Sequence, residues 1–152
     1  MTIALACDHT AVSFKKAIIE HFETKGYVCK DFGTHTEEMV DYPLYGIEVA
    51  NAVVSGTADK GVVICGTGIG MSLVCNKVAG VRCVLCNEHY SARMAREHND
   101  ANVIALGARV IGIELAKDLV DVFLSTEFAD PLGRHQPRLD MIQKIEQKQP
   151  LV

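Results

Sequence analysis

The stretch Gly61-Val62-Val63-Ile64-Cys65-Gly66-Thr67-Gly68-Ile69-Gly70-Met71-Ser72 joins an apolar run to a glycine-rich turn and then to a helical pattern. A short, almost wholly apolar run is typical of a strand that is buried on both faces of a parallel sheet. The glycines that follow favour a tight connection into a helix. The stretch therefore predicts one strand-turn-helix unit of an α/β protein.

The same unit recurs along the whole chain. Apolar runs near residues 2–7, 27–32, 61–65, 80–86 and 101–106 alternate with helical patterns near 12–25, 43–54, 71–78, 88–97 and 113–124. Such alternation predicts a parallel sheet covered by helices on both faces. We expect a three-layer, doubly wound (Rossmann-like) sandwich with a five-stranded parallel sheet, formed by residues 1–152 as a single domain.

An extra C-terminal helix follows these units and is opened by Pro137. Its residues Leu139, Ile142 and Ile145 form an apolar stripe at helical spacing. A terminal helix that arrives after the sheet is complete often packs on a second subunit, so the stripe predicts an oligomer.

Composition and charge exclude several classes of partner. The 152 residues have a net charge of −4 and give no basic footprint for nucleic acid or an anionic membrane. No window approaches the roughly 20 apolar residues of a membrane helix, and the N-terminus lacks a basic signal region. We therefore expect a cytoplasmic protein, whose six cysteines are reduced thiols rather than disulfides.

The turn after the third apolar run differs from the nucleotide-binding motifs. Glycines stand at 66, 68 and 70, but Met71 stands where the dinucleotide fingerprint has its third glycine. No lysine is placed for a P-loop. The backbone N–H groups of such a turn can hold an oxyanion, although a merely tight turn is an equal alternative.

Cys65 stands where the strand meets this turn. Because a helix N-terminus stabilises a thiolate, Cys65 is a candidate nucleophile or base, with a buried small hydrophobic residue as the alternative. We assign that structural role to Cys7, Cys29 and Cys75. The pair Cys83-Val-Leu-Cys86 lies in a predicted strand, where residues three apart point to opposite faces, so we expect packing rather than a metal site.

Candidate ligand groups follow other strands and helices. In open α/β sheets, ligands bind beyond the carboxyl ends of the strands, where Asp8, His9 and Arg109 are expected. His98 follows a predicted helix and is either a proton-transfer group or a helix cap. Solvated positions are expected for His21, His35 and His89.

A basic segment precedes the last helix. Arg134, His135 and Arg138 gather at the start of that helix, where free N–H groups also favour anions. This segment is a candidate phosphate site that Arg109 could join, and a solvated basic loop is the alternative.

Together these segments resemble the type B ribose-5-phosphate isomerases and their relatives, the galactose-6-phosphate and allose-6-phosphate isomerases. The matching segments, which span nearly the whole chain, are 6–9, 41–43, 64–72, 76–82, 96–110 and 133–138. The resemblance implies an aldose-ketose isomerase that acts on a phosphorylated sugar without a metal or nucleotide cofactor. It also implies a homodimer or a dimer of dimers with active sites between subunits.

The resemblance further implies a role for each matching site residue. Cys65 would be the base that moves a proton between C1 and C2 through an enediolate, Thr67 would assist it, and His98 would open the furanose ring. The remaining implied binding residues are Gly66, Gly68, Ile69, Gly70 and Met71 for the developing oxyanion, Asp8, His9, Tyr42 and Asn99 for the sugar, and Arg109, Arg134, His135 and Arg138 for the phosphate.

Three other interpretations stay open at this point. The substrate could be a six-carbon sugar, allose 6-phosphate or galactose 6-phosphate, because one additional CH–OH changes binding by only a few kcal/mol. A nucleotide- or flavin-binding module is the alternative of another class, since a fold does not fix a function. A thiol redox sensor is a third, for which no partner cysteine of Cys65 is evident.

Overall fold

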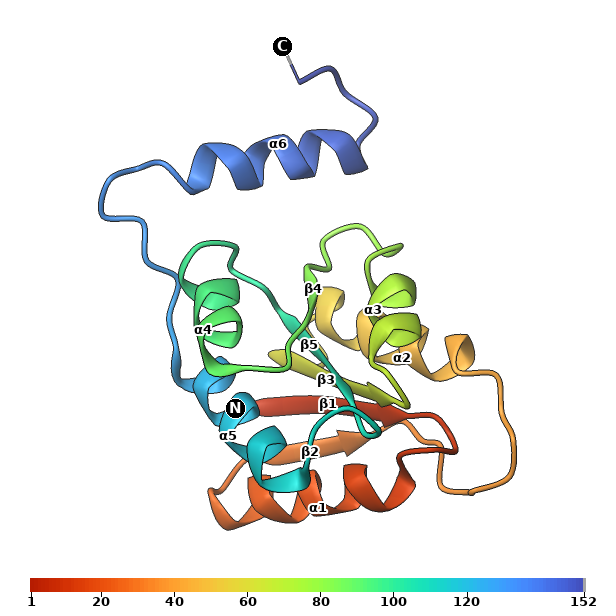
Figure 1. Cartoon of the computed structure of the whole chain (residues 1–152). Helices are drawn as coiled ribbons and strands as arrows, with labels where there is room; N and C mark the ends of the chain where they lie inside the picture. The colour runs from red at the N-terminus through yellow and green to blue at the C-terminus, as the bar shows by residue number, and fades with distance from the viewer. Residues whose placement is uncertain (152) are drawn as a thin grey trace.

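The strand predicted from the opening stretch, β3 (Lys60–Cys65), lies at the centre of a five-stranded sheet in the computed structural model, which describes residues 1–151. The strand order is β2-β1-β3-β5-β4, and every neighbouring pair is parallel. The other strands are β1 (Thr2–Cys7), β2 (Val28–Asp31), β4 (Cys83–Leu85) and β5 (Val103–Gly107). Residues 1–151 also form the helices α1 (Val12–Thr24), α2 (Pro43–Val54), α3 (Ile69–Cys75), α4 (His89–Glu97), α5 (Ile113–Ser125) and α6 (Gln136–Glu146) (Figure 1).

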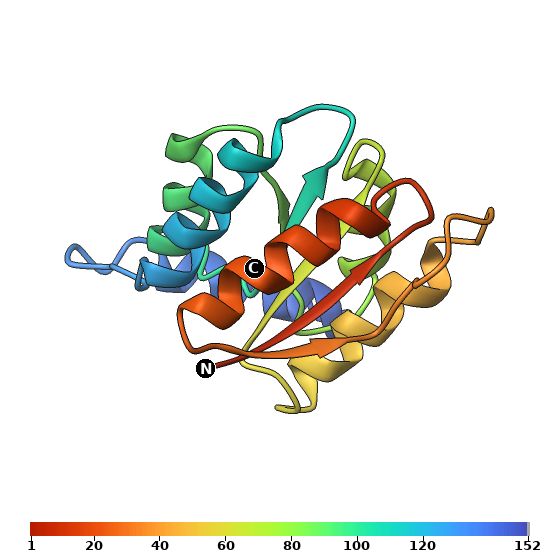
Figure 2. The ribbon, with the colours of Figure 1, turned by 90° about the horizontal axis from the view of Figure 1, so that it is seen from below.

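Both faces of the sheet are buried, which confirms the three-layer sandwich. Side chains alternate between the two faces along a strand, and in β1 the larger Ile3 and Leu5 pack with α1, α4 and α5. The smaller Ala4 and Ala6 pack with α2 and α3 on the other face. Figures 1 and 2 show these two groups of helices on opposite sides of the sheet.

The edges of the sheet differ from the sequence prediction. Strand β4 has three residues, whereas the apolar run predicted a strand over 80–86. The N–H groups of Arg82 and Cys83 bond instead to the side chains of Asn102 (2.8 Å) and Asn76 (2.9 Å), so regular pairing begins late. At the other edge, β2 is largely exposed on its outer side, with Val28 58% accessible.

Helix α6 stands apart from the sandwich, as Figure 1 shows. None of its residues is buried, and Ile142 and Ile145 are 39% and 60% exposed. The Glu146 carboxylate accepts a hydrogen bond from the Gly80 N–H (3.0 Å), which ties the far end of the helix to the body. The apolar stripe predicted from the sequence is therefore largely uncovered in a single chain, although its first member, Leu139, is half-buried.

None of the helices within residues 1–151 is both long enough and apolar enough to span a bilayer.

Candidate functional site

The end of β3 presents the thiol of Cys65 to the glycine-rich turn. Cys65 pairs with Gly107 of β5 and is only 5% exposed. Its Sγ accepts a hydrogen bond from the Gly68 N–H at 3.1 Å, and the Thr67 Oγ1 accepts one from the Ile69 N–H at 3.3 Å. A backbone donor aimed at the sulfur stabilises negative charge there, so this arrangement suits a thiolate.

The shape of the turn requires glycine at two positions. Gly68 has φ of +78°, and a Cβ added there would lie 2.4 Å from Leu85 Cδ1. At Gly70 an added Cβ would lie 2.7 Å from the ring of Tyr42. The turn leads into the first turn of α3, where the N–H groups of Gly70 and Met71 have no acceptor four residues earlier within the helix. Their position in the first turn of the helix thus leaves these two amide donors available beside Cys65.

The neighbouring strand β1 ends beside this turn. The Asp8 N–H donates to the Ile64 carbonyl (3.1 Å), which sets Asp8 against the end of β3. The Asp8 carboxylate accepts hydrogen bonds from the N–H (2.9 Å) and Oγ1 (2.6 Å) of Thr10. His9 accepts a hydrogen bond at Nδ1 from the Val40 N–H (3.4 Å).

Arg109 approaches the turn from the end of β5. Its N–H donates to the Gly66 carbonyl at 2.9 Å, and its Cδ would lie 3.4 Å from a Cβ added at Gly66. We call the residues gathered here the carboxyl-edge group. The group consists of Asp8, His9, Tyr42, Cys65, Gly66, Thr67, Gly68, Ile69, Gly70, Met71 and Arg109.

A second group of predicted site residues lies elsewhere. His98 caps the C-terminus of α4, and its ring stacks on that of His135, with centroids 4.2 Å apart and planes 14° apart. Arg134 and His98 line one small cavity with His135. We call His98, Asn99, Arg134, His135 and Arg138 the amino-edge group.

The two groups lie at opposite edges of the sheet. The turn between α4 and β5 runs beside the start of β3, where the Gly61 N–H donates to the Asn102 carbonyl (2.9 Å). Cys65 is at the other end of β3, and a six-residue strand separates its two ends by about 16 Å. Cys65 and His98 of one chain therefore face different edges. Arg109, the further candidate for the phosphate site, lies at the carboxyl edge beside Gly66, whereas Arg134 and Arg138 of the same chain lie at the amino edge.

The remaining cysteines lie where packing was expected, apart from Cys29, which is only half-buried. Cys83 and Cys86 face opposite sides of the sheet, with Cys83 in the same cluster as Cys75. Burial is the main cause that raises the pKa of the Cys7 thiol to about 11.

One histidine prediction was wrong. His21 is only 18% exposed rather than fully solvated, because its Nε2 bonds to the Asp121 carboxylate (2.9 Å) where α1 packs against α5. His35 and His89 are exposed as predicted.

Two supporting residues were not identified from the sequence. Thr10 orients the Asp8 carboxylate, and the Asp-x-Thr spacing, common in turns where a carboxylate bonds two residues ahead, was an available signal. Asp130 accepts hydrogen bonds from the N–H groups of residues 134, 135 and 136. No short motif marks a carboxylate that binds amides four to six residues later.

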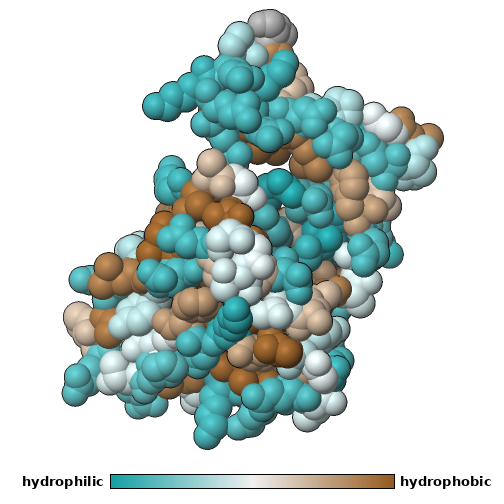
Figure 3. All heavy atoms as spheres, turned by 180° about the vertical axis from the view of Figure 1, so that it is seen from behind, coloured by the Kyte–Doolittle hydropathy of each residue, from teal (hydrophilic) through white to brown (hydrophobic). Residues whose placement is uncertain are grey.

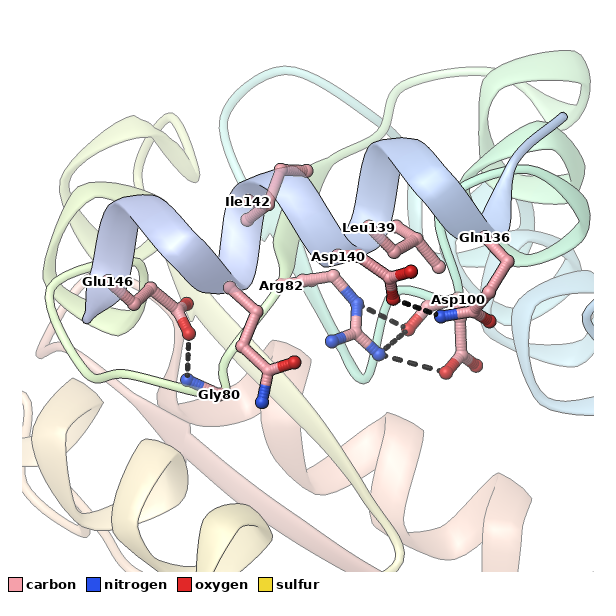
Figure 4. Close-up of a pocket in the computed structure, with 9 residues that line it drawn as sticks. Gly80, Arg82, Asp100, Gln136, Leu139, Asp140, Ile142 and Glu146 are labelled. Carbon is pink, nitrogen blue, oxygen red and sulfur yellow. Dashed lines mark hydrogen bonds and ion pairs between the residues drawn. The ribbon is translucent and has the colours of Figure 1, made fainter. Parts of the chain in front are cut away.

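A cavity of about 180 Å³ lies beneath α6 (Figure 4). Arg82 donates to the Asp100 carboxylate and carbonyl oxygen (both 2.8 Å), and the Gln136 amide donates to Asp140 (2.8 Å). Figure 3 shows hydrophobic atoms on the lower side of the projecting arm, above a hollow. Arg82 pairs with Asp100, and the carboxylates of Asp140 and Glu146 accept hydrogen bonds from Gln136 and the Gly80 N–H. Each charged group of this cavity thus has a partner, so the cavity offers a surface for packing rather than a reactive centre. Nowhere in residues 1–151 do three or more His, Cys, Asp or Glu side chains gather as a metal site.

Comparison with known proteins gives consistent matches. The family described as Ribose/Galactose Isomerase matches residues 3–142. Ribose-5-phosphate isomerase B of Escherichia coli is 47% identical over 146 residues, which cover 96% of this chain and 97% of that protein. The solved structure of Clostridium thermocellum ribose-5-phosphate isomerase B has a TM-score of 0.95 at 50% identity, covering 97% of this chain and 99% of that one. A galactose-6-phosphate isomerase subunit of Clostridium acetobutylicum is 42% identical over 128 residues, covering 84% of this chain and 74% of that protein.

Proposed function

The chain belongs to the ribose/galactose isomerase family and is an isomerase, and we propose that it interconverts ribose 5-phosphate and ribulose 5-phosphate. The observation that supports this most directly is the sulfur of Cys65, which accepts the Gly68 N–H at the carboxyl edge of the sheet. A thiolate held in this way can act as a base toward a carbon-bound proton.

The proposed reaction needs one base and several fixed donors. The Cys65 thiolate removes the proton from C2 of the open-chain aldose, a C1–C2 double bond forms, and negative charge develops on O1. Of the predicted oxyanion donors, the N–H groups of Gly68 and Ile69 already bond to Cys65 and Thr67. We therefore assign O1 to the N–H groups of Gly70 and Met71, because fixed dipoles aimed at developing charge stabilise the transition state. The thiol then returns the proton to C1 while the O2 proton moves to O1, which yields the ketose. Thr67 assists from the same turn.

Ring opening needs a second proton-transfer group, and we assign it to His98. His98 donates a proton to the ring oxygen and accepts one from the C1 hydroxyl. Because His98 and Cys65 of one chain face opposite edges, we infer that a second copy supplies its amino-edge group to the carboxyl-edge group of the first. The uncovered apolar stripe of α6 supports such a homodimer, either alone or as half of a dimer of dimers.

The carboxyl-edge group of one copy and the amino-edge group of the other then bind different parts of the substrate. Asp8, fixed by Thr10, and His9 contact the sugar from one copy, and Asn99 contacts its hydroxyls from the other. The phosphate lies between Arg109 of the first copy and two arginines of the second, Arg134 and Arg138. His135 of the second copy is a further candidate phosphate ligand. Arginine suits this task because its planar guanidinium binds phosphate oxygens in pairs.

A six-carbon substrate is the second candidate. The name of the galactose-6-phosphate isomerase relative supports it, since that protein is 42% identical to this chain over 128 aligned residues. Tyr42, whose ring packs against Gly70, would lie near the C1 end of the sugar, where a longer substrate would press against it.

The test is the rate at which purified protein forms ribulose 5-phosphate from ribose 5-phosphate, measured beside allose 6-phosphate and galactose 6-phosphate. We expect Cys65→Ala to lose about 10²–10⁴-fold in kcat, the usual contribution of a positioned acid-base group. Cys29→Ala, a half-buried thiol of the edge strand β2, is the matched control and should keep its rate. Full activity in Cys65→Ala would refute the role of the thiolate. Turnover of a hexose phosphate alone would favour the second candidate, and co-purifying nucleotide without any turnover would favour a nucleotide-binding module.

A further inference from the structure

The stacked pair His98 and His135 contains one accessible ring and one buried ring. His135 is 6% exposed, whereas His98 is half-buried. The two rings are nearly parallel, with centroids 4.2 Å apart, so the His135 ring lies against one face of the His98 ring. Aromatic contact on one face restricts rotation of an imidazole without occupying its nitrogens.

The backbone that holds His135 is itself fixed. The Asp130 carboxylate accepts hydrogen bonds from the N–H groups of Arg134 (2.8 Å), His135 (3.0 Å) and Gln136 (2.8 Å). Desolvation opposes the charge of Asp130, but these backbone donors outweigh it and lower the pKa of the carboxyl group. The ring of His135 therefore projects from a rigid segment toward α4.

The surroundings keep His135 neutral. Arg134 Nε donates to His135 Nε2 (3.3 Å), so this nitrogen is an acceptor and the proton of the ring is on Nδ1. Burial first, then the neighbouring His98 and Arg134, lower the pKa of His135, and Arg138 adds to them while Asp130 opposes them. Glu97 is the other charged group that lines this cavity. A neutral ring can stack on His98 whether or not His98 carries a proton.

From this geometry we infer that His135 is a positioning residue, which holds the His98 imidazole in the orientation needed for ring opening. The inference rests on the proposed function and deepens it. It gives His135 a role that differs from a direct phosphate contact, since its ring is used by His98 and its Nε2 by Arg134.

Two substitutions separate these roles. His135→Phe keeps a flat ring against His98 but has no nitrogen, and His135→Ala removes the ring. We expect His135→Ala to lose about 10²-fold in kcat with ribose 5-phosphate, since misplacement of a catalytic group by about 1 Å has that effect. His135→Phe should recover most of the rate, and KM should change little in both. His89→Ala, at an exposed histidine outside the site, is the control.

Three outcomes would overturn the inference. Equal losses of kcat in the Phe and Ala variants would mean that a nitrogen of His135 takes part in the chemistry. A rise in KM with unchanged kcat in both would make His135 a phosphate ligand. Unchanged kinetics in His135→Ala would mean that His98 needs no support. If His135→Ala does not fold, His135→Leu replaces it, because leucine fills the space without an aromatic face.

A second measurement does not depend on isomerase activity. The stacked ring of His135 shifts the NMR resonance of the His98 Cε1–H by its ring current. This shift should be lost in His135→Ala and kept in His135→Phe. Loss of the shift without loss of rate would refute the positioning role, whereas an inactive wild type that still shows the shift would refute the proposed function instead.

Discussion

The substitution Gly68→Ala tests how the turn beside Cys65 is built. Gly68 has φ of +78°, and a left-handed conformation costs a non-glycine residue about 1–2 kcal/mol. The new Cβ would also lie 2.4 Å from Leu85 Cδ1 and 2.9 Å from the carbonyl carbon of Leu106. Overpacking of this kind costs about 1–3 kcal/mol. The free energy of unfolding should therefore fall by about 2–5 kcal/mol in total.

Gly56→Ala separates the two contributions. Gly56 has φ of +73°, but an added Cβ would meet no atom within 4 Å. This control should lose only the conformational part, about 1–2 kcal/mol. Urea unfolding, at one protein concentration because of the expected oligomer, measures both variants against the wild type. Equal losses in the two variants would refute the argument from close packing at Gly68.

The remaining predictions are measured by unfolding in urea or by the rate of sugar phosphate isomerisation. Lys15→Met removes a buried ammonium that pairs with the partly exposed Asp31 and donates to the Thr34 carbonyl (3.0 Å). Stability should fall by about 1–3 kcal/mol in urea unfolding, because buried acceptors lose their donor, and an unchanged midpoint would contradict this. The pKa of His135 is lowered in the folded protein, mainly by burial, so the unfolded chain binds that proton more tightly below about pH 6.5. Stability should therefore fall as the pH drops from 7 to 5, and the fall should be smaller in His135→Phe; equal slopes would show that His135 does not contribute. His98→Asn should slow turnover of the cyclic ribose 5-phosphate more than turnover of ribulose 5-phosphate, and equal losses in the two directions would remove the ring-opening role.

The apolar runs of the sequence predicted the central strands because β1, β3 and β5 are buried on both faces. The same reasoning overestimated β4, because side chains of Asn76 and Asn102 replace regular pairing before Cys83. The start of α3 was predicted two residues late, since the left-handed Gly68 is itself the N-cap of the helix.

The position of Cys65 and His98 at opposite edges of the sheet could be predicted from the order of strands and helices alone. A residue that follows a helix and precedes a parallel strand lies at the amino edge of the sheet, and His98 is such a residue. The stacking of His98 on His135 could not be predicted from the sequence, because it depends on the path of the segment between α5 and α6. Asp130 fixes that path by accepting hydrogen bonds from backbone N–H groups. Almost every residue type carries a backbone N–H, so these bonds leave no pattern in the sequence.

Subunit complementation tests the central claim most directly, namely that Cys65 of one copy works with His98 of another. Cys65→Ala and His98→Asn chains are each nearly inactive alone if the claim holds. When equal amounts are unfolded and refolded together, half of the dimers are mixed, and each mixed dimer has one intact site of two. Two-fold symmetry then predicts recovery of about a quarter of the wild-type isomerase rate. Activity that stays at the level of the separate variants, despite mixed dimers being formed, would contradict it.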